Sequence, residues 1–295
     1  MNIRLLLLLP CALLAPVLLA SAPKPTAAEP AADVAPLQPI REFDVETLCR
    51  LGREIYRQDQ LAWHGTDALS AKIGQAQMAA EHCTGWLVDM SGAEPLLRFV
   101  RKAGEAEEAA YDVRFPSDAK PTVTVPENRE LTEHQKAIRR AYATATKGFA
   151  EANLPLCPCR GSYNFVVLDD PAGPGFLVYL LRPKSTNFEI PVGGHYRISV
   201  TADGNTVTQI DRLWKTCLSM DKRQGVASSG KLMAVTMTSV VSEKPLEIHV
   251  FLSLQENLSI FVGTSDLKVW AVENGTIRQV SAEPKLAPTA GPAAK

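Results

Sequence analysis

The chain has 295 residues, of which 46% are hydrophobic and 21% charged, and its formal net charge is −1. This composition is that of an ordinary globular protein. The balanced charge leaves no basic stripe for binding nucleic acid. No run of 18 apolar residues follows the N-terminal segment, so we expect no transmembrane segment in the mature chain.

The first 22 residues have the pattern of a secretory signal. Arg4 precedes an apolar run over residues 5–20, and small residues follow. A membrane anchor is the alternative, but a spanning helix needs about 20 apolar residues, and Pro10 and Pro16 interrupt this run. We therefore expect residues 1–22 to be a cleaved signal peptide and the protein to be periplasmic or secreted.

Two Pro- and Ala-rich stretches border the central part of the chain. Residues 23–42 contain few bulky apolar side chains, so burial cannot offset the entropy lost on ordering them. They predict a linker, and residues 283–295 predict a disordered tail of similar composition. Residues 43–282 remain as an α+β domain, with a possible subdomain boundary in the polar stretch 116–130.

Helical patterns come first along the chain. Apolar residues recur at helical spacing over 43–60, and a second helix is expected over 67–82. Residues 95–103 and the alternating segment 109–115 predict a hairpin. A third helix is expected over 131–150, where Thr132 and Gln135 fit a capping box and Ile138, Ala141 and Phe149 lie on one stripe.

From Tyr163 onward the pattern favours strands. Asp203-Gly204 and Asn274-Gly275 are tight-turn pairs that favour hairpins. Short turns between successive strands imply antiparallel pairing. We therefore expect an α+β fold with N-terminal helices, one mid-chain helix and a C-terminal antiparallel β-sheet. The expected strands are 164–170, 176–182, 195–200, 206–214, 232–241, 246–254, 258–264, 267–272 and 276–280.

Five cysteines remain once Cys11 is assigned to the signal peptide. In an oxidising compartment they favour disulfides. We expect a Cys49–Cys83 bond and a bond from Cys217 to either Cys157 or Cys159. The C-x-C pair at 157–159 could also hold a metal or act in redox chemistry, but no second ligand pair with zinc spacing is present.

The stretch GVASSGKL, residues 225–232, lacks one residue of the nucleotide-binding P-loop pattern. A P-loop joins a buried strand to a helix and ends in Ser or Thr, which holds magnesium. Here a strand-like segment follows, and Leu232 stands at the Ser/Thr position. We therefore expect no nucleotide and no other cofactor to bind. We interpret residues 225–232 as a hairpin loop.

Four polar residues stand out as weak catalytic candidates. Strand alternation places His195 and Arg197 on one face of 195–200, and Glu247 shares a face with His249 in the strand expected over 246–254. If adjacent, these side chains could bind a metal or transfer protons, since histidine titrates near neutral pH. The simpler interpretation is two solvated strand faces. The other histidines, His64, His82 and His134, are expected at the surface.

The sequence contains no G-x-S-x-G, H-E-x-x-H or G-x-G-x-x-G signature of catalytic or cofactor sites. The favoured function is a non-catalytic binding or envelope structural role, with a small ligand or an envelope protein as partner. Its site is expected on a sheet face or in a cleft near residues 183–195. The alternative is a metal-assisted hydrolase that uses His195 and His249.

Overall fold

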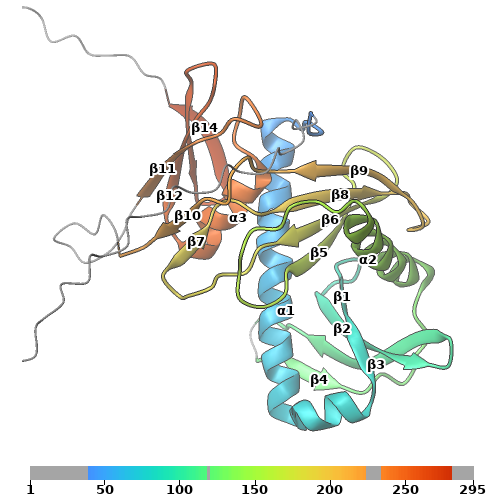
Figure 1. The fold of residues 1–295 in the computed structure, drawn as a ribbon. Helices are drawn as coiled ribbons and strands as arrows, with labels where there is room; N and C mark the ends of the chain where they lie inside the picture. Colours follow the sequence, from blue (N-terminus) through green and yellow to red (C-terminus); the bar gives the residue numbers. More distant parts are fainter. Residues whose placement is uncertain (1–38, 118–119, 224–233, 281–295) are drawn as a thin grey trace, which may run out of the picture. The chain divides into compact units, whose positions relative to one another are not determined.

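The computed structural model describes residues 39–117, 120–223 and 234–280. These residues belong to one compact unit that begins at Leu37. The predicted signal peptide, most of the predicted linker, the stretch 225–232 and the predicted tail lie outside the described residues. The fold is α+β, with helices and several largely antiparallel sheets, as the sequence pattern predicts (Figure 1).

Helix α1 (Val45–Ala80) runs unbroken through the gap expected between the two N-terminal helices and is interrupted by a kink at Gly74 instead. Asp44 caps its start by accepting a hydrogen bond of 2.8 Å from the backbone N–H of Thr47. Gly65 lies in the stretch between the two predicted helices. A Cβ at this position would collide with Leu97, so glycine here permits close packing rather than ending the helix.

The next part of the chain forms an antiparallel sheet in the order β1-β2-β3-β4. The predicted hairpin is confirmed as the pairing of β2 with β3. The predicted boundary region contributes the edge strand β4, which pairs with β3. The four strands span Cys83–Asp89, Leu96–Ala103, Ala106–Arg114 and Thr122–Thr124.

The mid-chain helix α2 (Glu133–Glu151) has the predicted capping box. Gln135 donates its N–H to the hydroxyl of Thr132 over 3.2 Å and accepts from the Thr132 N–H over 3.3 Å. The following strands form a second antiparallel sheet in the order β5-β6-β8-β9. They span Asn164–Asp169, Phe176–Leu181, Tyr196–Val200 and Val207–Arg212.

The C-terminal strands do not extend this second sheet. A short pair, β7 (Glu189–Pro191) with β10 (Ser219–Asp221), stands apart from a separate sheet in the order β11-β12-β13-β14. In this sheet β11 pairs with β12 in parallel, which corrects the expectation of antiparallel pairing throughout. The four strands span Ala234–Thr238, Ser259–Gly263, Val269–Glu273 and Thr276–Val280.

The parallel pair is possible because the segment between its strands is helical. The predicted strand 246–254 is wrong, since Glu247–Glu256 forms helix α3. Residues 247–253 of α3 are buried, and the helix packs against α1 (Figure 1). Gly52 of α1 allows this contact, because a Cβ there would lie 2.5 Å from the carbonyl oxygen of Glu247. A helix that is buried all round has apolar side chains on every face and loses its amphipathic pattern.

One disulfide, Cys157–Cys217, is present among the described residues, which selects one of the two predicted partners of Cys217. The predicted Cys49–Cys83 bond is wrong, and both cysteines are free thiols, as is Cys159. An α-helix rises about 1.5 Å per residue, so the Cα atom of Gly74 lies about 40 Å from that of Cys49. A disulfide needs Cα atoms within about 7 Å.

The end of the predicted linker belongs to the fold. Arg41 forms a bidentate ion pair with Asp170, and its N–H donates to Asp211 over 3.2 Å. The ordered domain therefore begins before residue 43. Within the described residues, no helix combines the length and the apolar character needed to cross a membrane.

Candidate functional site

Of the four polar residues singled out in the sequence, Arg197 and Glu247 form an ion pair inside the protein, whereas His195 and His249 each make separate contacts. Strand β8 lies in the middle of its sheet, and both of its faces are buried. Arg197 donates to Glu247 on α3 over 2.6 Å and to Asp211 on β9 over 2.9 Å. Burial alone would lower the pKa of Arg197, but the charge of Glu247, with other neighbours, raises the pKa above its ordinary value.

His195 has both ring nitrogens occupied. Nδ1 accepts the backbone N–H of Arg182 over 3.1 Å, and Nε2 lies 2.6 Å from the carbonyl oxygen of Pro191. Because one nitrogen must accept and the other must donate, the ring is neutral with its proton on Nε2. Burial lowers the pKa of His195 to about 4, and the charge of Arg182 adds to this effect.

His249 caps the helix that the sequence pattern missed. It occupies the third position of α3, and its Nδ1 accepts the N–H of Leu246 over 2.8 Å. A Glu or Gln usually makes this contact in a capping box. Burial lowers the pKa of His249 to about 4, and the positive charge that His195 would carry lowers it further.

These contacts give the hydrolase hypothesis no support. Arg197 and Glu247 are 0% exposed and His195 is 1% exposed, so their polar atoms are not presented to a substrate. Within the described ranges, no three His, Cys, Asp or Glu side chains are grouped so that they could hold a metal ion. The other histidines, His64, His82 and His134, are exposed as predicted.

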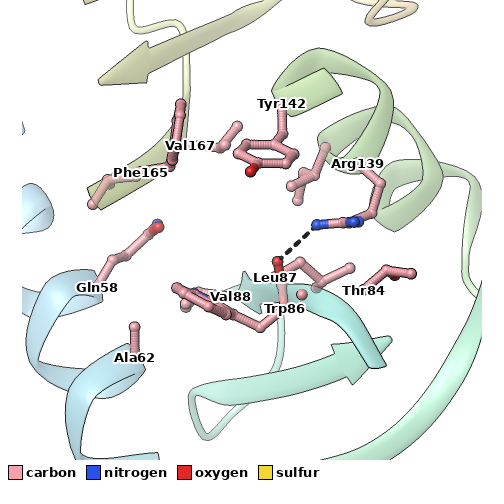
Figure 2. A pocket seen from close by; sticks show the side chains of 13 residues that line it. Gln58, Ala62, Thr84, Trp86, Leu87, Val88, Arg139, Tyr142, Phe165 and Val167 are labelled. Atoms are coloured by element: carbon pink, nitrogen blue, oxygen red, sulfur yellow. Dashed lines mark hydrogen bonds between the residues drawn. The ribbon is translucent and has the colours of Figure 1, made fainter. Parts of the chain in front are cut away.

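The first candidate site is a cavity of about 120 Å³ where α1, β1, α2 and β5 meet. Its walls are mostly apolar and include Leu87, Val88, Phe165 and Val167 (Figure 2). These residues come from segments far apart in the sequence. Small-molecule and side-chain pockets typically combine apolar walls of this kind with a few convergent polar groups.

Two polar groups enter this cavity from opposite sides, the amide of Gln58 and the hydroxyl of Tyr142 (Figure 2). Gln58 is only 8% exposed, and its one side-chain hydrogen bond, to Glu54, is long at 3.4 Å. The ring of Tyr142 is held edge-on against Phe165, with centroids 4.7 Å apart. Both groups are therefore placed to receive a hydrogen-bonding partner within an apolar enclosure.

Arg139 closes one side of the cavity. Its guanidinium forms a bidentate pair with Glu107, with both bonds at 2.8 Å, and donates to the carbonyl of Trp86 over 3.3 Å (Figure 2). Gly85 permits this approach, since a Cβ there would lie 3.1 Å from the guanidinium. The charge of Arg139 is thus neutralised within the wall, and it fixes β1 against α2.

A larger groove of about 580 Å³ adjoins the cavity, and Ala62, Trp86 and Phe165 line both. Trp63 and Trp86 stand beside it with 57% and 42% of their surfaces exposed. Most large aromatic side chains in a folded chain are largely buried. Two exposed tryptophans at one groove therefore make it a candidate binding surface.

Two of the side chains that line this groove are acidic. Asp59 and Asp67 line it on either side of Trp63 along α1, at helical spacing, and neither makes a salt bridge within the described residues. Burial raises the pKa of Asp59. Of the basic residues at the groove, Arg182 is paired with Glu189, whereas Lys184 shares the buried Glu256 with Lys222 and its charge also acts on Asp59. We call the cavity and this groove together the tryptophan groove.

The residues of the tryptophan groove are not among the site residues predicted from the sequence. The cleft expected near 183–195 is represented at its edge by Pro183 and Lys184, but its main walls come from α1 and β1. The spacing of Asp59, Trp63 and Asp67 along one helix face was the available signal. No family model, curated protein or solved structure matches this chain.

Proposed function

We propose that this chain is an exported, periplasmic or secreted binding protein that holds a peptide segment in the tryptophan groove. The segment would place an apolar side chain in the cavity and a basic side chain beside Asp59 and Asp67. The observation that carries this proposal is the meeting of an apolar cavity with an acidic, tryptophan-lined groove. Aromatic faces attract cations as well as offering apolar surface.

The cavity favours a side chain over a large free ligand. At about 120 Å³ it holds one branched or aromatic group. The adjoining groove is open enough for the rest of a chain to pass along α1. Gln58 and Tyr142 would bond to the backbone of the bound segment, because amide and hydroxyl groups can satisfy peptide N–H and C=O groups.

The test uses fluorescence anisotropy with labelled eight-residue peptides of alternating Leu and Lys, compared with Leu and Glu. We expect the Leu/Lys peptide to bind and the Leu/Glu peptide to bind at least tenfold more weakly, a difference of about 1.4 kcal/mol. Tetramethylammonium is the competitor that tests for a simple cation site. Equal binding of both peptides, or binding of neither, would overturn the proposal.

Matched variants locate the interaction. Ala62→Leu fills the wall shared by cavity and groove and should abolish binding, whereas Ala71→Leu changes an exposed position of the same helix. Asp59→Asn with Asp67→Asn should weaken binding of the Leu/Lys peptide about tenfold, because it removes both carboxylates that line the groove. Glu105→Gln with Glu127→Gln, at two exposed positions, controls for net charge.

A further inference from the structure

Three cysteines lie at or beside the disulfide between Cys157 and Cys217. Cys159 is a free thiol, and only Pro158 separates it from Cys157 in the C-x-C pair. None of the three cysteines lines the tryptophan groove. An inference about them therefore does not rest on the proposed function.

The three cysteines differ in their access to solvent. Cys157 is only 2% exposed, whereas Cys217 is exposed and Cys159 is half-buried. Leu156 and Leu218, the neighbours of the two bonded cysteines, are exposed as well. The disulfide therefore joins a buried cysteine to one at the surface, and a free thiol stands next to it in the chain.

Cys159 is close enough to Cys157 for a disulfide between them. An extended chain advances at most about 3.6 Å per residue, so the two Cα atoms are separated by about 7 Å or less. Disulfides form at Cα separations of up to about 7 Å. Residues 154–159 belong to no helix or strand, so no ladder of backbone hydrogen bonds opposes a local rotation.

Tyr163 marks the position of the Cys159 sulfur. The hydroxyl of Tyr163 accepts the backbone N–H of Cys157 over 3.3 Å. Burial raises the pKa of Tyr163, and the charge of a Cys159 thiolate raises it further, which places this sulfur near the same hydroxyl. The Cys159 thiol itself donates only to the carbonyl oxygen of Gly161, over 3.7 Å. A thiol is a weak donor, so little is lost when Cys159 moves.

Burial decides which sulfur Cys159 displaces. A thiolate that attacks a disulfide forms a bond to one sulfur and releases the other as a thiolate. Attack on Cys217 would leave the charge on the buried Cys157, where desolvation disfavours it. Attack on Cys157 instead leaves the charge on Cys217, which is exposed to water. The favoured product therefore has Cys157 bonded to Cys159.

We infer that Cys157, Cys159 and Cys217 form a thiol–disulfide exchange site, in which Cys159 displaces Cys217 from Cys157 and leaves Cys217 as an accessible thiol. Cys159 gives its proton to solvent and bonds to the Cys157 sulfur. The Cys157–Cys217 bond breaks, its electron pair stays on the Cys217 sulfur, and that sulfur takes a proton from solvent. One disulfide and one thiol exist before and after, so the step needs no oxidant or reductant. Cys217 then becomes a modification site for thiol-reactive groups.

Labelling with a maleimide carried on a long polyethylene glycol chain tests this inference. Cys83→Ser protein is used at pH 8, because Cys49 is buried and only Cys159 and Cys217 then remain within reach of the reagent. We expect peptide mapping to find the label on Cys217 together with a Cys157–Cys159 bond. Label on Cys159 alone, or a bond between Cys159 and Cys217, would overturn the inference.

Matched variants identify the attacking sulfur. Cys159→Ser keeps a hydroxyl for the Gly161 carbonyl and should slow labelling of Cys217 by about tenfold or more, because no thiolate remains beside Cys157. Cys49→Ser removes a buried thiol, keeps an acceptor for the Ile277 N–H and should leave the rate unchanged. Equal labelling of Cys217 in Cys159→Ser would refute the inference, as would a rate that rises with protein concentration, since the proposed exchange is intramolecular.

Discussion

Mild acid should destabilise this protein through its two buried histidines. Burial lowers the pKa of both His195 and His249 to about 4, whereas an unfolded histidine titrates near 6.5. Between these values the unfolded chain binds more protons than the folded one. Stability is therefore complete above about pH 6.5 and falls as the pH drops toward 4.

The size of this effect follows from the two pKa values. At pH 5 a histidine that titrates near 6.5 when unfolded and near 4 when folded reduces the free energy of unfolding by about 2 kcal/mol. Two such histidines give about 4 kcal/mol, a large fraction of the ~5–15 kcal/mol typical of a folded domain. The three aspartates whose pKa lies at about 2, Asp203, Asp221 and Asp266, lose their stabilising effect only at lower pH.

Urea unfolding at pH 7.5 and pH 5 measures the effect. Asp59 acts in the opposite direction, because its raised pKa favours proton binding by the folded state, so the comparison is best made in an Asp59→Asn background. His249→Asn keeps an acceptor for the Leu246 N–H and should halve the loss on acidification, and His64→Gln controls for removal of an exposed imidazole. A loss below about 1 kcal/mol would refute the reasoning, since proton binding by two histidines with these pKa values requires a larger one.

Two further predictions concern the interior and the disulfide. Arg197→Met leaves two buried carboxylates without their cation and should cost about 3–5 kcal/mol in urea unfolding, while adding Glu247→Gln should recover part of that loss. A single-variant cost below about 1 kcal/mol would contradict this. Cys217→Ser opens a crosslink between residues 60 apart in sequence and should cost about 4 kcal/mol. Peptide mapping should find Cys217 joined to Cys157, and a bond to Cys159 would contradict the structure.

Local signals predicted much of the fold because they act within a few residues. The Thr132–Gln135 capping box is a reciprocal contact three residues long, and it starts α2 as expected. Asp203-Gly204 and Asn274-Gly275 mark the turns between the strands that pair across them. These signals need no knowledge of the rest of the chain.

The segment 246–254 shows where local pattern reading fails. Its apolar sequence is equally compatible with a strand and with a fully buried helix, and periodicity alone cannot distinguish the two. The outcome was decided by tertiary contacts, since Gly52 of α1 leaves room for the α3 backbone. Once α3 is a helix, β11 and β12 can run in parallel, because parallel strands need a crossover between them.

The candidate sites were hidden for a related reason. Alternation predicted a shared strand face for His195 and Arg197, but β8 begins only at Tyr196, and alternation carries no information on whether a second layer covers the sheet. The cavity of the tryptophan groove combines Gln58, Trp86, Tyr142 and Phe165, which no spacing rule relates. Only their arrangement in space reveals the site.

The Gly193-Gly194 pair shows how the disulfide is connected to the cavity of about 360 Å³ that Gly193, Leu213 and Met237 line. A side chain at Gly193 would collide with the carbonyl of Thr216, and the Gly193 N–H donates to the carbonyl of Leu218 over 2.9 Å. Between those two residues, Cys217 is bonded to Cys157, which itself packs against Gly194. One wall of the cavity is therefore fixed by backbone contact and by a covalent bond at once. A wall that is already ordered need not lose conformational entropy when a ligand arrives, so the disulfide favours a preformed site.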